Sequence, residues 1–461
     1  MDVRPVDWFT PLHIETDLPR LEVFGDLPRG LCGTLYRNGP SPHFPTRDHL
    51  FAGDGMVHAF VLGEGKASYR NRWVRTDKWM AEDRAGHALV GGFGGPSAAG
   101  ADVPRTGVAN TNVIWHGARL LALEEAHLPF ELDPATLATR GVQDFAGGWR
   151  GPFTAHPKTD PRTGELIAFA YNTDLTLSPA MQYGTLSADG RVTRFEPFDA
   201  PYCSMVHDFA VTDRHVLFPV LPLAGLRERA KAGQMPYAWK PELGGHVGLI
   251  RRDAGVASLR WFAVPPCYVF HVMNAWDAPD GRIVVDVIQF AAAPLFPHAD
   301  GGAADPAAER GYLARWTIDP AADTDMVAVE ILEDIPGEFP RCDERRAGLP
   351  YRYGVFSAGI TDIDAFDGLV WRDLQAGRHE RYALPRGDGM SEAVFVPRAP
   401  DAPEGDGWLL AMAFRAAEGR TDLLVFDTSA VSAGPVATVK LPHHVPFGFH
   451  GNWVDATGRM S

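Results

Sequence analysis

The chain has 461 residues, of which 45% are hydrophobic and 22% are charged, and its formal net charge is −15. This is the composition of a globular protein with a large core, and the lack of any run of five basic residues argues against nucleic acid as a partner. The first residues, MDVRPVDWFT, show no secretory leader pattern, and no apolar run is long enough to span a bilayer. We therefore expect a cytoplasmic protein without a transmembrane segment, which leaves peripheral membrane contact open.

The four cysteines are widely scattered and form no CxxC pair: Cys32, Cys203, Cys267 and Cys342. This spacing favours reduced, buried thiols over disulfides, in keeping with a cytoplasmic location.

Short apolar runs separated by turn residues recur along the whole chain. Strands are expected in the runs 21–24, 33–40, 51–60, 67–76, 120–123, 166–171, 215–220, 282–290, 408–414 and 422–426. Turn pairs such as Asp189-Gly190 and Asp280-Gly281 lie between them. One helix is expected within Ala224–Ala232 (AGLRERAKA), where it interrupts the strand pattern.

Many short strands at fairly even spacing predict an all-β fold. A β-propeller accounts best for this length, since about seven blades of four strands would use the whole chain. No blade repeat such as Trp-Asp recurs, so the pattern alone leaves the blade number open. No linker divides the chain, which predicts a single domain over residues 1–461.

Four of the 17 histidines share one setting, an apolar or small-residue run at a strand start: His156, His207, His271 and His450. A single histidine of this kind is usually a packed core residue. In a propeller, however, the inner strands of successive blades end near one axis, so distant residues can converge there. Four imidazoles would suit a metal such as Fe(II). Spacing alone leaves both interpretations open.

Several segments, in the same order along the chain, resemble the carotenoid cleavage oxygenase family, which includes apocarotenoid, lignostilbene and isoeugenol oxygenases. They are GTLYRNGP (33–40), GDGMV (53–57), FTAHPK (153–158), MVHDF (205–209), GEFPR (337–341), SEAVFVPR (391–398) and the run 447–453. The resemblance implies a seven-bladed β-propeller with a loop and helix cap over an axial Fe(II). By motif position, it gives the ligand roles to the four histidines.

The resemblance also assigns residues around the metal. Glu125, Glu338 and Glu392 would accept hydrogen bonds from the far ring nitrogens of His207, His271 and His450, respectively. Thr111 matches a threonine whose methyl group crowds one open metal position, and the other position would bind O2.

Three further positions concern the substrate. Stilbene-cleaving members use a tyrosine and a lysine to hold a 4-hydroxyl group, and the matching positions here are Phe93 and Glu124. This departure weakens a lignostilbene assignment, although Glu124 could accept from a hydroxyl group in another pose. Phe51 matches an aromatic residue that stacks near the alkene. Without the resemblance, core packing explains both phenylalanines equally well.

The implied activity is an Fe(II)-dependent dioxygenase that cleaves a C=C bond with O2 to give carbonyl products. We expect an apocarotenoid-like polyene as the substrate, and the alternative is a stilbene or phenylpropenyl phenol such as lignostilbene, isoeugenol or vinylguaiacol. Two further hypotheses are a propeller that binds a hydrophobic ligand without turnover, and an enzyme that isomerises its substrate with ester cleavage. The sequence agrees by omission with a lack of nucleotide cofactors, because it has no GxGxxG after a strand and no P-loop.

Overall fold

The computed structural model describes residues 7–44, 49–91, 103, 106–362, 365–458 and 460. Within these residues the strands form seven sheets of four or five strands and one two-stranded ribbon. The predicted all-β class is confirmed, and seven sheets is the number expected of a seven-bladed propeller. The chain also divides into two compact units. Unit 1 falls within Met1–Glu124, Pro129–Gln143 and Arg352–Ser461, and unit 2 within Glu125–Leu128 and Asp144–Tyr351. The single domain over 1–461 stays a prediction.

Unit 1 contains two five-stranded sheets, one four-stranded sheet and the last three strands of another. The first five-stranded sheet has the order β1 (Asp17–Leu18), β5 (Lys66–Trp73), β4 (Gly55–Gly63), β3 (Gly33–Pro40), β32 (Gly451–Asp455). The second has the order β2 (Glu22–Gly25), β31 (Ala437–Lys440), β30 (Arg420–Asp427), β29 (Gly407–Arg415), β28 (Gly389–Pro397). The four-stranded sheet comprises β6 (Asn112–His116), β7 (Arg119–Leu123), β8 (Phe130–Leu132) and β9 (Thr139–Val142), and the three remaining strands are β25 (Tyr353–Ala358), β26 (Gly368–Asp373) and β27 (Arg378–Ala383).

Unit 2 contains three four-stranded sheets, the two-stranded ribbon and β24 (Gly337–Cys342), which belongs to the sheet of β25. The first sheet comprises β10 (Lys158–Thr159), β11 (Leu166–Tyr171), β12 (Ala180–Leu186) and β13 (Val192–Asp199). The second comprises β14 (Ala210–Val211), β15 (His215–Val220), β18 (Gly245–Arg251) and β19 (Gly255–Val264). The third comprises β20 (Tyr268–Asp277), β21 (Ile283–Phe290), β22 (Gly311–Ile318) and β23 (Ala328–Ile331). The ribbon pairs β16 (Leu223–Gly225) with β17 (Tyr237–Trp239).

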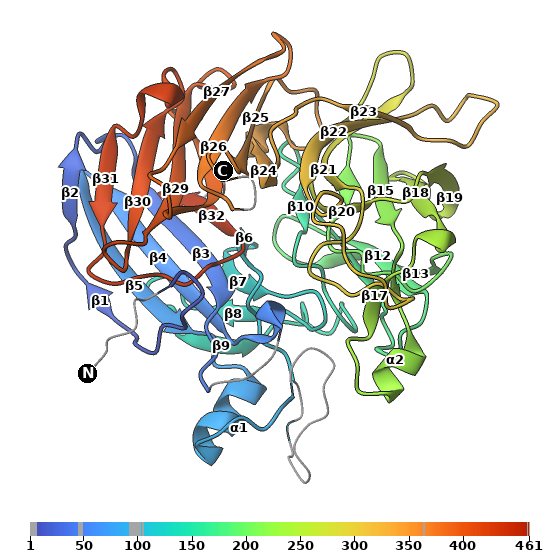
Figure 1. Cartoon of the computed structure of the whole chain (residues 1–461), viewed down its shortest axis with the longest axis horizontal. Coiled ribbons are helices and arrows are strands. Elements are labelled where there is room, and N and C mark those ends of the chain that lie inside the picture. Colours follow the sequence, from blue (N-terminus) through green and yellow to red (C-terminus); the bar gives the residue numbers. More distant parts are fainter. Residues whose placement is uncertain are drawn as a thin grey trace. The chain divides into compact units, whose positions relative to one another are not determined.

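The C-terminal strand β32 completes a sheet that begins near the N-terminus. It pairs with β3 in antiparallel register from Gly33↔Asp455 to Arg37↔Gly451, so the blue and red ends of the chain share one sheet (Figure 1). Trp453 on β32 is only 2% exposed and packs in the core of unit 1. This pairing fixes the segment just before β32, which carries His450.

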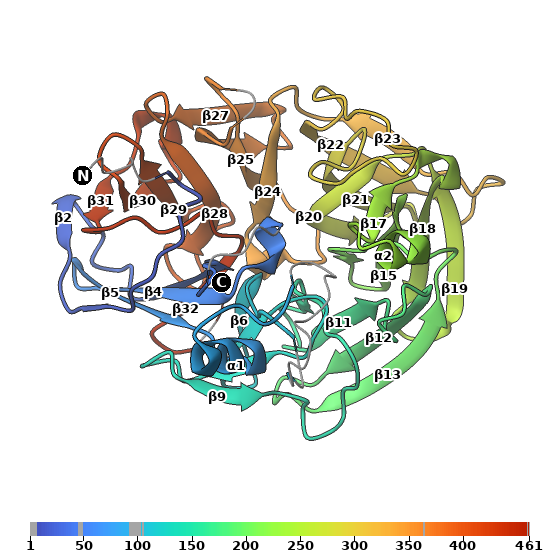
Figure 2. The same ribbon diagram turned by 60° about the horizontal axis from the view of Figure 1, so that its bottom comes forward.

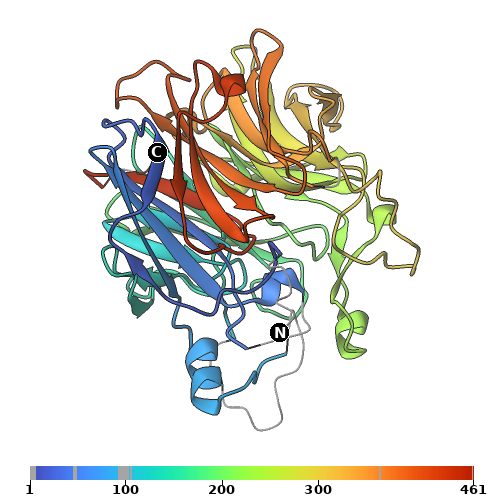
Figure 3. The ribbon, with the colours of Figure 1, turned by 60° about the vertical axis from the view of Figure 1, so that its left-hand side comes forward.

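Several predicted strands have the predicted limits, whereas the helix prediction needs correction. Gly33–Pro40, Leu166–Tyr171 and His215–Val220 are strands with those bounds. The expected helix within Ala224–Ala232 is shorter, because Leu223–Gly225 pairs as β16 and α2 covers only Arg227–Lys231. Figure 3 shows α2 as the green helix at the tip of the β16–β17 hairpin. The 3-10 helices are η1 (Leu50–Ala52), η2 (Pro241–Leu243), η3 (Glu344–Arg346) and η4 (Val431–Ala433).

A longer helix, α1 (Asp77–Ala85), was not predicted from the sequence. Thr76 begins it as an N-cap, since its side chain accepts a hydrogen bond from the Trp79 backbone, and Gly86 ends it with a φ of 73°. Lys78 on α1 is buried and contacts Asp54 and Glu82, each at 2.8 Å. The helix was missed because two of its four buried residues, Lys78 and Glu82, are charged, which interrupts the apolar stripe expected of a packed helix.

Aromatic rings fill much of the core of unit 2. The rings of Phe169, Phe209 and Phe218 lie with their centroids 4.7 to 5.8 Å apart, and all three are at most 1% exposed. The strands β11, β12 and β13 run side by side in this unit (Figure 2). Phe209 directly follows the MVHD segment, so the core holds the stretch of chain that carries His207.

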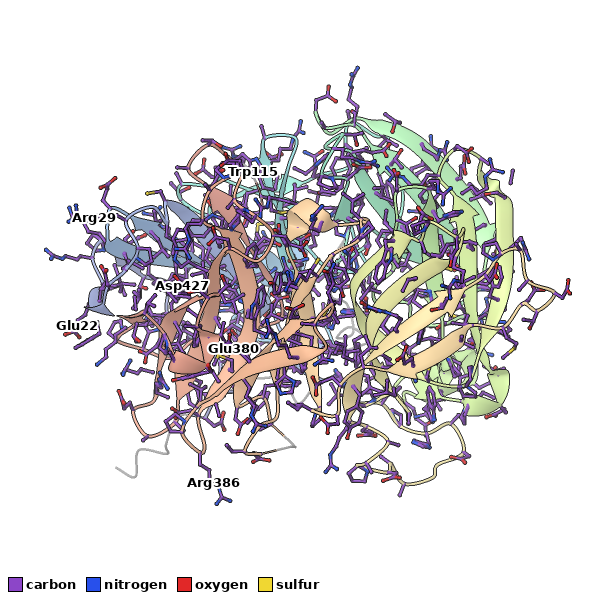
Figure 4. The ribbon with its side chains drawn as sticks, turned by 90° about the horizontal axis from the view of Figure 1, so that it is seen from above. Glu22, Arg29, Trp115, Glu380, Arg386 and Asp427 are labelled. Atoms are coloured by element: carbon purple, nitrogen blue, oxygen red, sulfur yellow. The ribbon has the colours of Figure 1, made fainter. Side chains whose placement is uncertain are left out.

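The surface carries exposed charges, as expected of an acidic globular chain. On unit 1, Glu22, Arg29 and Arg386 are exposed, and Figure 4 shows the two arginines pointing away from the ribbon.

The four cysteines are free thiols, and Cys203, Cys267 and Cys342 are buried. None of the helices among the described residues has the length and hydropathy that crossing a bilayer requires.

Unit 1 also buries a histidine whose pKa is lowered in the folded state. His58 on β4 is 3% exposed, and its Nδ1 lies 2.7 Å from the Tyr69 hydroxyl group. Burial, followed by the charges of His443, Arg37 and His444, lowers the pKa of His58 to about 3. Since an unfolded histidine titrates near 6.5, the unfolded chain binds a proton at mildly acidic pH that the folded chain excludes.

We expect His58 to make the protein less stable as the pH falls below 6.5. The contribution lost between pH 7 and pH 5 is about 2 kcal/mol, because the folded pKa lies far below both values. The matched variant is His58→Gln, which keeps a polar partner for Tyr69 but cannot take up a proton. Urea unfolding at pH 7 and pH 5 should show a smaller pH effect in the variant. Equal pH effects in the two proteins would contradict this account.

Candidate metal centre

Three of the four predicted histidines come from unit 2, each from a different segment. His156 precedes β10, His207 precedes β14 and His271 lies within β20, and all three are buried. The β20–β21 pairing is irregular between Val269 and Val272, where two residues of β20 oppose one residue of β21. Such a bulge re-aims a side chain, and here it includes His271.

The ring nitrogens of these histidines face one another at short range. His207 Nε2 lies 3.0 Å from His156 Nε2 and 3.2 Å from His271 Nε2. Neighbouring ligands at right angles on a divalent first-row metal, with metal–nitrogen distances of about 2.1 Å, would lie about 3.0 Å apart. The spacing therefore suits adjacent ligands of one ion.

Carboxylates lie behind two of these rings. Glu125 Oε2 is 2.7 Å from His207 Nδ1, and Glu338 Oε2 is 2.5 Å from His271 Nδ1. Burial lowers the pKa of His207, but the charge and hydrogen bond of Glu125 outweigh burial and raise the pKa above its usual value. When Nδ1 donates its proton to a carboxylate, the neutral ring presents a bare acceptor at Nε2. Such acceptors favour a cation between them.

His450, in unit 1, has a carboxylate partner of the same kind. Glu392 Oε1 lies 2.9 Å from His450 Nδ1, and Glu392 Oε2 accepts from the Gly451 backbone at 2.9 Å and from Arg37 at 2.7 Å. Arg37 also donates to the Phe449 carbonyl at 2.9 Å. The buried arginine on β3 thus ties Glu392 to the segment that carries His450.

The four histidines form one group: ring nitrogens of His156, His207, His271 and His450 all lie within 4.8 Å of one another. A set of neutral imidazoles suits iron, copper, nickel or zinc better than a hard cation such as calcium. Because the far nitrogens of three rings contact carboxylates, the donor set fits a divalent transition metal held in a fixed orientation.

The structure places two other predicted residues beside the chain of His450. The Thr111 carbonyl accepts from the His450 backbone at 3.2 Å, and the Thr111 hydroxyl contacts Asn110 at 3.1 Å. Asn110 in turn donates to the carbonyls of Phe51 and Gly53. The Phe51 ring meets the Phe449 ring edge-on at 5.5 Å, next to His450 in sequence.

Glu124 and Phe93 are the two positions that depart from the stilbene-cleaving pattern, and the structure describes only Glu124. Glu124 is 8% exposed, and its Oε1 accepts from the Val108 backbone at 2.8 Å. This carboxylate therefore has a role within the loop that precedes β6. Phe93 lies outside the described residues.

Three charged residues that contact the site were not predicted, although they lie within the motifs that carry the resemblance. Arg37 is part of GTLYRNGP, Lys158 of FTAHPK and Asp208 of MVHDF. Asp208 is 2% exposed and pairs with Lys158 at 2.7 Å. Charge within an otherwise apolar motif was the available signal, since a buried charge requires a partner.

Comparison with known proteins defines the class. The family model described as retinal pigment epithelial membrane protein matches residues 9–455. An isoeugenol monooxygenase of Pseudomonas nitroreducens is 37% identical, and the match covers 98% of each chain. Among solved structures, a lignostilbene dioxygenase of Pseudomonas brassicacearum is 36% identical with a TM-score of 0.93, and the match covers 97% of each chain. A cobalt-substituted apocarotenoid oxygenase of Synechocystis is 30% identical with a TM-score of 0.88, and covers 98% of each chain.

An all-β fold of seven sheets with four clustered imidazoles is that of a non-haem metal oxygenase. The chain belongs to the carotenoid cleavage oxygenase family. The predicted seven-bladed β-propeller and the predicted enzyme class, an alkene-cleaving oxygenase, are both confirmed. The four-histidine group suits the non-haem iron of this family.

Replacing His450 tests whether the group holds iron. We expect the wild-type protein to contain about one iron per chain, and His450→Ala to contain less than about a tenth of that, because a lost ligand cannot be replaced from this donor set. Plasma emission spectrometry measures the metal, and circular dichroism checks the fold. The control is His13→Ala, since His13 is exposed. A His450→Ala protein that keeps its iron would contradict the ligand set.

Proposed function

We propose that this protein is an Fe(II)-dependent oxygenase that cleaves a C=C bond of a small hydrophobic alkene with O2 to give two carbonyl products. The carrying observation is the group of four imidazoles within 4.8 Å of one another, with carboxylates behind three of them. We assign the metal-ligand roles to His156, His207, His271 and His450. When bound, Fe(II) supplies the redox chemistry that activates O2, so no organic cofactor is needed.

The proposal gives the surrounding residues distinct tasks. Glu125, Glu338 and Glu392 accept hydrogen bonds from the far ring nitrogens and so fix the tautomer and the orientation of the three rings. Thr111 would crowd one open position of the bound metal with its methyl group. Phe51, whose ring packs on Phe449, forms part of the apolar wall for the substrate.

As the substrate we propose first an aryl alkene, a phenylpropenyl phenol or a stilbene. The isoeugenol and lignostilbene oxygenases are 37% and 36% identical to this chain, whereas the apocarotenoid oxygenase is 30% identical and has the lower TM-score. An edge-on pair of phenylalanine rings suits an aromatic ligand.

An apocarotenoid-like polyene is the second candidate, and one contact favours it. Glu124 stands where stilbene-cleaving members use a lysine, and its Oε1 is hydrogen-bonded to the Val108 backbone. A buried carboxylate committed in this way is a poor substitute for a lysine that binds a phenolate. The presence of phenylalanine at position 93, where stilbene-cleaving members use a tyrosine, also favours the polyene as the substrate.

The cellular setting is part of the same proposal. Four free cysteines suit a cytoplasmic enzyme. A hydrophobic substrate would also be consistent with transient contact between the protein and a membrane surface.

A substrate panel tests the proposal directly. Isoeugenol, resveratrol and an apocarotenal should be incubated with the iron-loaded enzyme, and the products identified by mass spectrometry. We expect isoeugenol to yield vanillin, and ¹⁸O₂ will show whether one or both product carbonyls take oxygen from O2. The His450→Ala variant is the control for iron-dependent turnover. Cleavage of the apocarotenal alone would establish the second candidate, and no cleavage of any alkene would refute the proposal.

The phenolic hydroxyl group provides a sharper comparison. Because Glu124 contacts Val108, we expect little dependence on this hydroxyl: kcat/KM for isoeugenol and for its O-methyl ether should differ by less than about 10-fold. A site with a charged partner for the phenol would lose about 10- to 100-fold on methylation. Glu124→Lys should increase the preference for isoeugenol, and Glu124→Gln is its matched control.

A further inference from the structure

The three histidine-bearing segments of unit 2 share a second connection, formed by the residues that follow each histidine. Lys158 lies two residues after His156, Asp208 directly follows His207, and Val272 directly follows His271. The side chain of Asp208 contacts both of the others. One carboxylate thus links three segments that are separated by up to 115 residues in sequence (156 to 271).

The contacts of Asp208 use both carboxylate oxygens. Oδ1 lies 2.7 Å from Lys158 Nζ and accepts from the Phe209 backbone at 2.8 Å, and Oδ2 accepts from the Val272 backbone at 2.9 Å. The Asp208 side chain is 2% exposed, whereas the Lys158 side chain is 26% exposed. A buried carboxylate needs such compensation, because desolvation of an unpaired charge is strongly unfavourable.

The contact with Val272 falls where the β20–β21 ladder is irregular. The pairing register shifts on both sides of Val272, so the strand is not held there by an even ladder of backbone hydrogen bonds. Asp208 accepts the Val272 N–H at this point. The carboxylate therefore stabilises the bulge that directs His271 toward His207, whose Nε2 lies 3.2 Å away.

We propose that Lys158 and Asp208 are positioning residues that set the spacing of the three imidazoles of unit 2. Lys158 neutralises Asp208 and anchors the segment of His156, and Asp208 fixes the segments of His207 and His271 relative to each other. Neither residue needs to touch the metal or the substrate. Glu125 and Glu338 orient individual rings, whereas this pair fixes the backbones from which the rings project.

The proposal rests on the proposed ligand set, and iron release tests it without reference to turnover. Iron-loaded holoenzyme is mixed anaerobically with an excess of a ferrous chelator, and the absorbance of the chelate gives the release rate. We expect Lys158→Met to release iron about 10-fold faster than wild type, and Asp208→Asn about 10- to 100-fold faster, as for other partners that orient metal ligands. Lys158→Arg keeps the charge and should stay within about 3-fold of wild type.

A matched ion pair separates positioning from general stability. Arg315 and Asp286 lie 2.8 Å apart in unit 2, with side-chain exposures of 27% and 0%, and their ion pair joins β22 to β21. Arg315 also packs over the Trp276 ring at 5.0 Å, five residues beyond His271 and outside the bulge of β20. Arg315→Met should lower the thermal unfolding temperature as Lys158→Met does, yet leave iron release unchanged. The electron paramagnetic resonance spectrum of the Fe(II)–nitric oxide adduct should change shape in Lys158→Met and not in Arg315→Met.

The outcomes separate the two proposals. Wild-type protein that binds no iron would refute the proposed function itself. Wild-type protein that binds iron, with Lys158→Met and Asp208→Asn releasing it at the wild-type rate, would overturn only the positioning role. Equal acceleration in Arg315→Met would also overturn it, since the effect would then be one of stability. If Lys158→Met folds poorly, Asp208→Asn, which keeps the shape of the side chain and one acceptor oxygen, decides the matter.

Discussion

Imidazole nitrogens that face one another as bare acceptors repel, and the candidate centre depends on this constraint. His207 Nε2 lies 3.0 and 3.2 Å from two other Nε2 atoms, while its Nδ1 contacts Glu125. When His207 Nδ1 donates its proton to that carboxylate, Nε2 of the neutral ring is a bare acceptor, and a metal ion between the rings relieves the repulsion. Without such an ion, the protein itself must hold the rings together. The bulge in β20, the carboxylates and the buried ion pairs around them all serve this purpose.

The carboxylates behind the histidine rings, Glu392, Glu338 and Glu125, differ in what offsets their desolvation. Glu392 pairs with the buried Arg37 and with a backbone N–H. Glu338 accepts from the adjacent Phe339 backbone. Glu125 stays partly accessible to solvent, with 14% of its side chain exposed, and it lies near Tyr171, whose pKa is raised by burial and then by the charge of Glu125. A carboxylate compensated by an arginine presents less net negative charge than one compensated by neutral donors. His450 therefore has a carboxylate neighbour whose negative charge is partly offset by Arg37.

The parts of this structure that the sequence predicted are those set by local pattern. Strand β3 has its predicted limits because GTLYRNGP is bounded by turn residues, and the four histidines stand out because each lies in an apolar run. The helix α1 escaped prediction because Lys78 buries its charge against Asp54, a contact made across 24 residues. The pairing of Lys158 with Asp208 escaped for the same reason: it is a tertiary contact between two motifs, each of which alone indicates a simple strand start. A charge pair between residues far apart in the sequence produces no periodic pattern by which the sequence could predict it.

The fold and the sequence motifs predict the metal site more closely than they predict the substrate. Oxygenases named for a lignostilbene and for an apocarotenoid match this chain with TM-scores of 0.93 and 0.88, so the same backbone serves an aromatic alkene and a polyene. We therefore look for discrimination in side chains near the metal, and Glu124 is the one whose charge is reversed relative to stilbene-cleaving members. Stilbene-cleaving members have a lysine here that holds the phenol. In this chain the Glu124 carboxylate accepts a hydrogen bond from the Val108 backbone in the loop before β6. The proposed site would therefore bind its alkene by shape and apolar contact, with the paired rings of Phe51 and Phe449 as proposed contact surfaces.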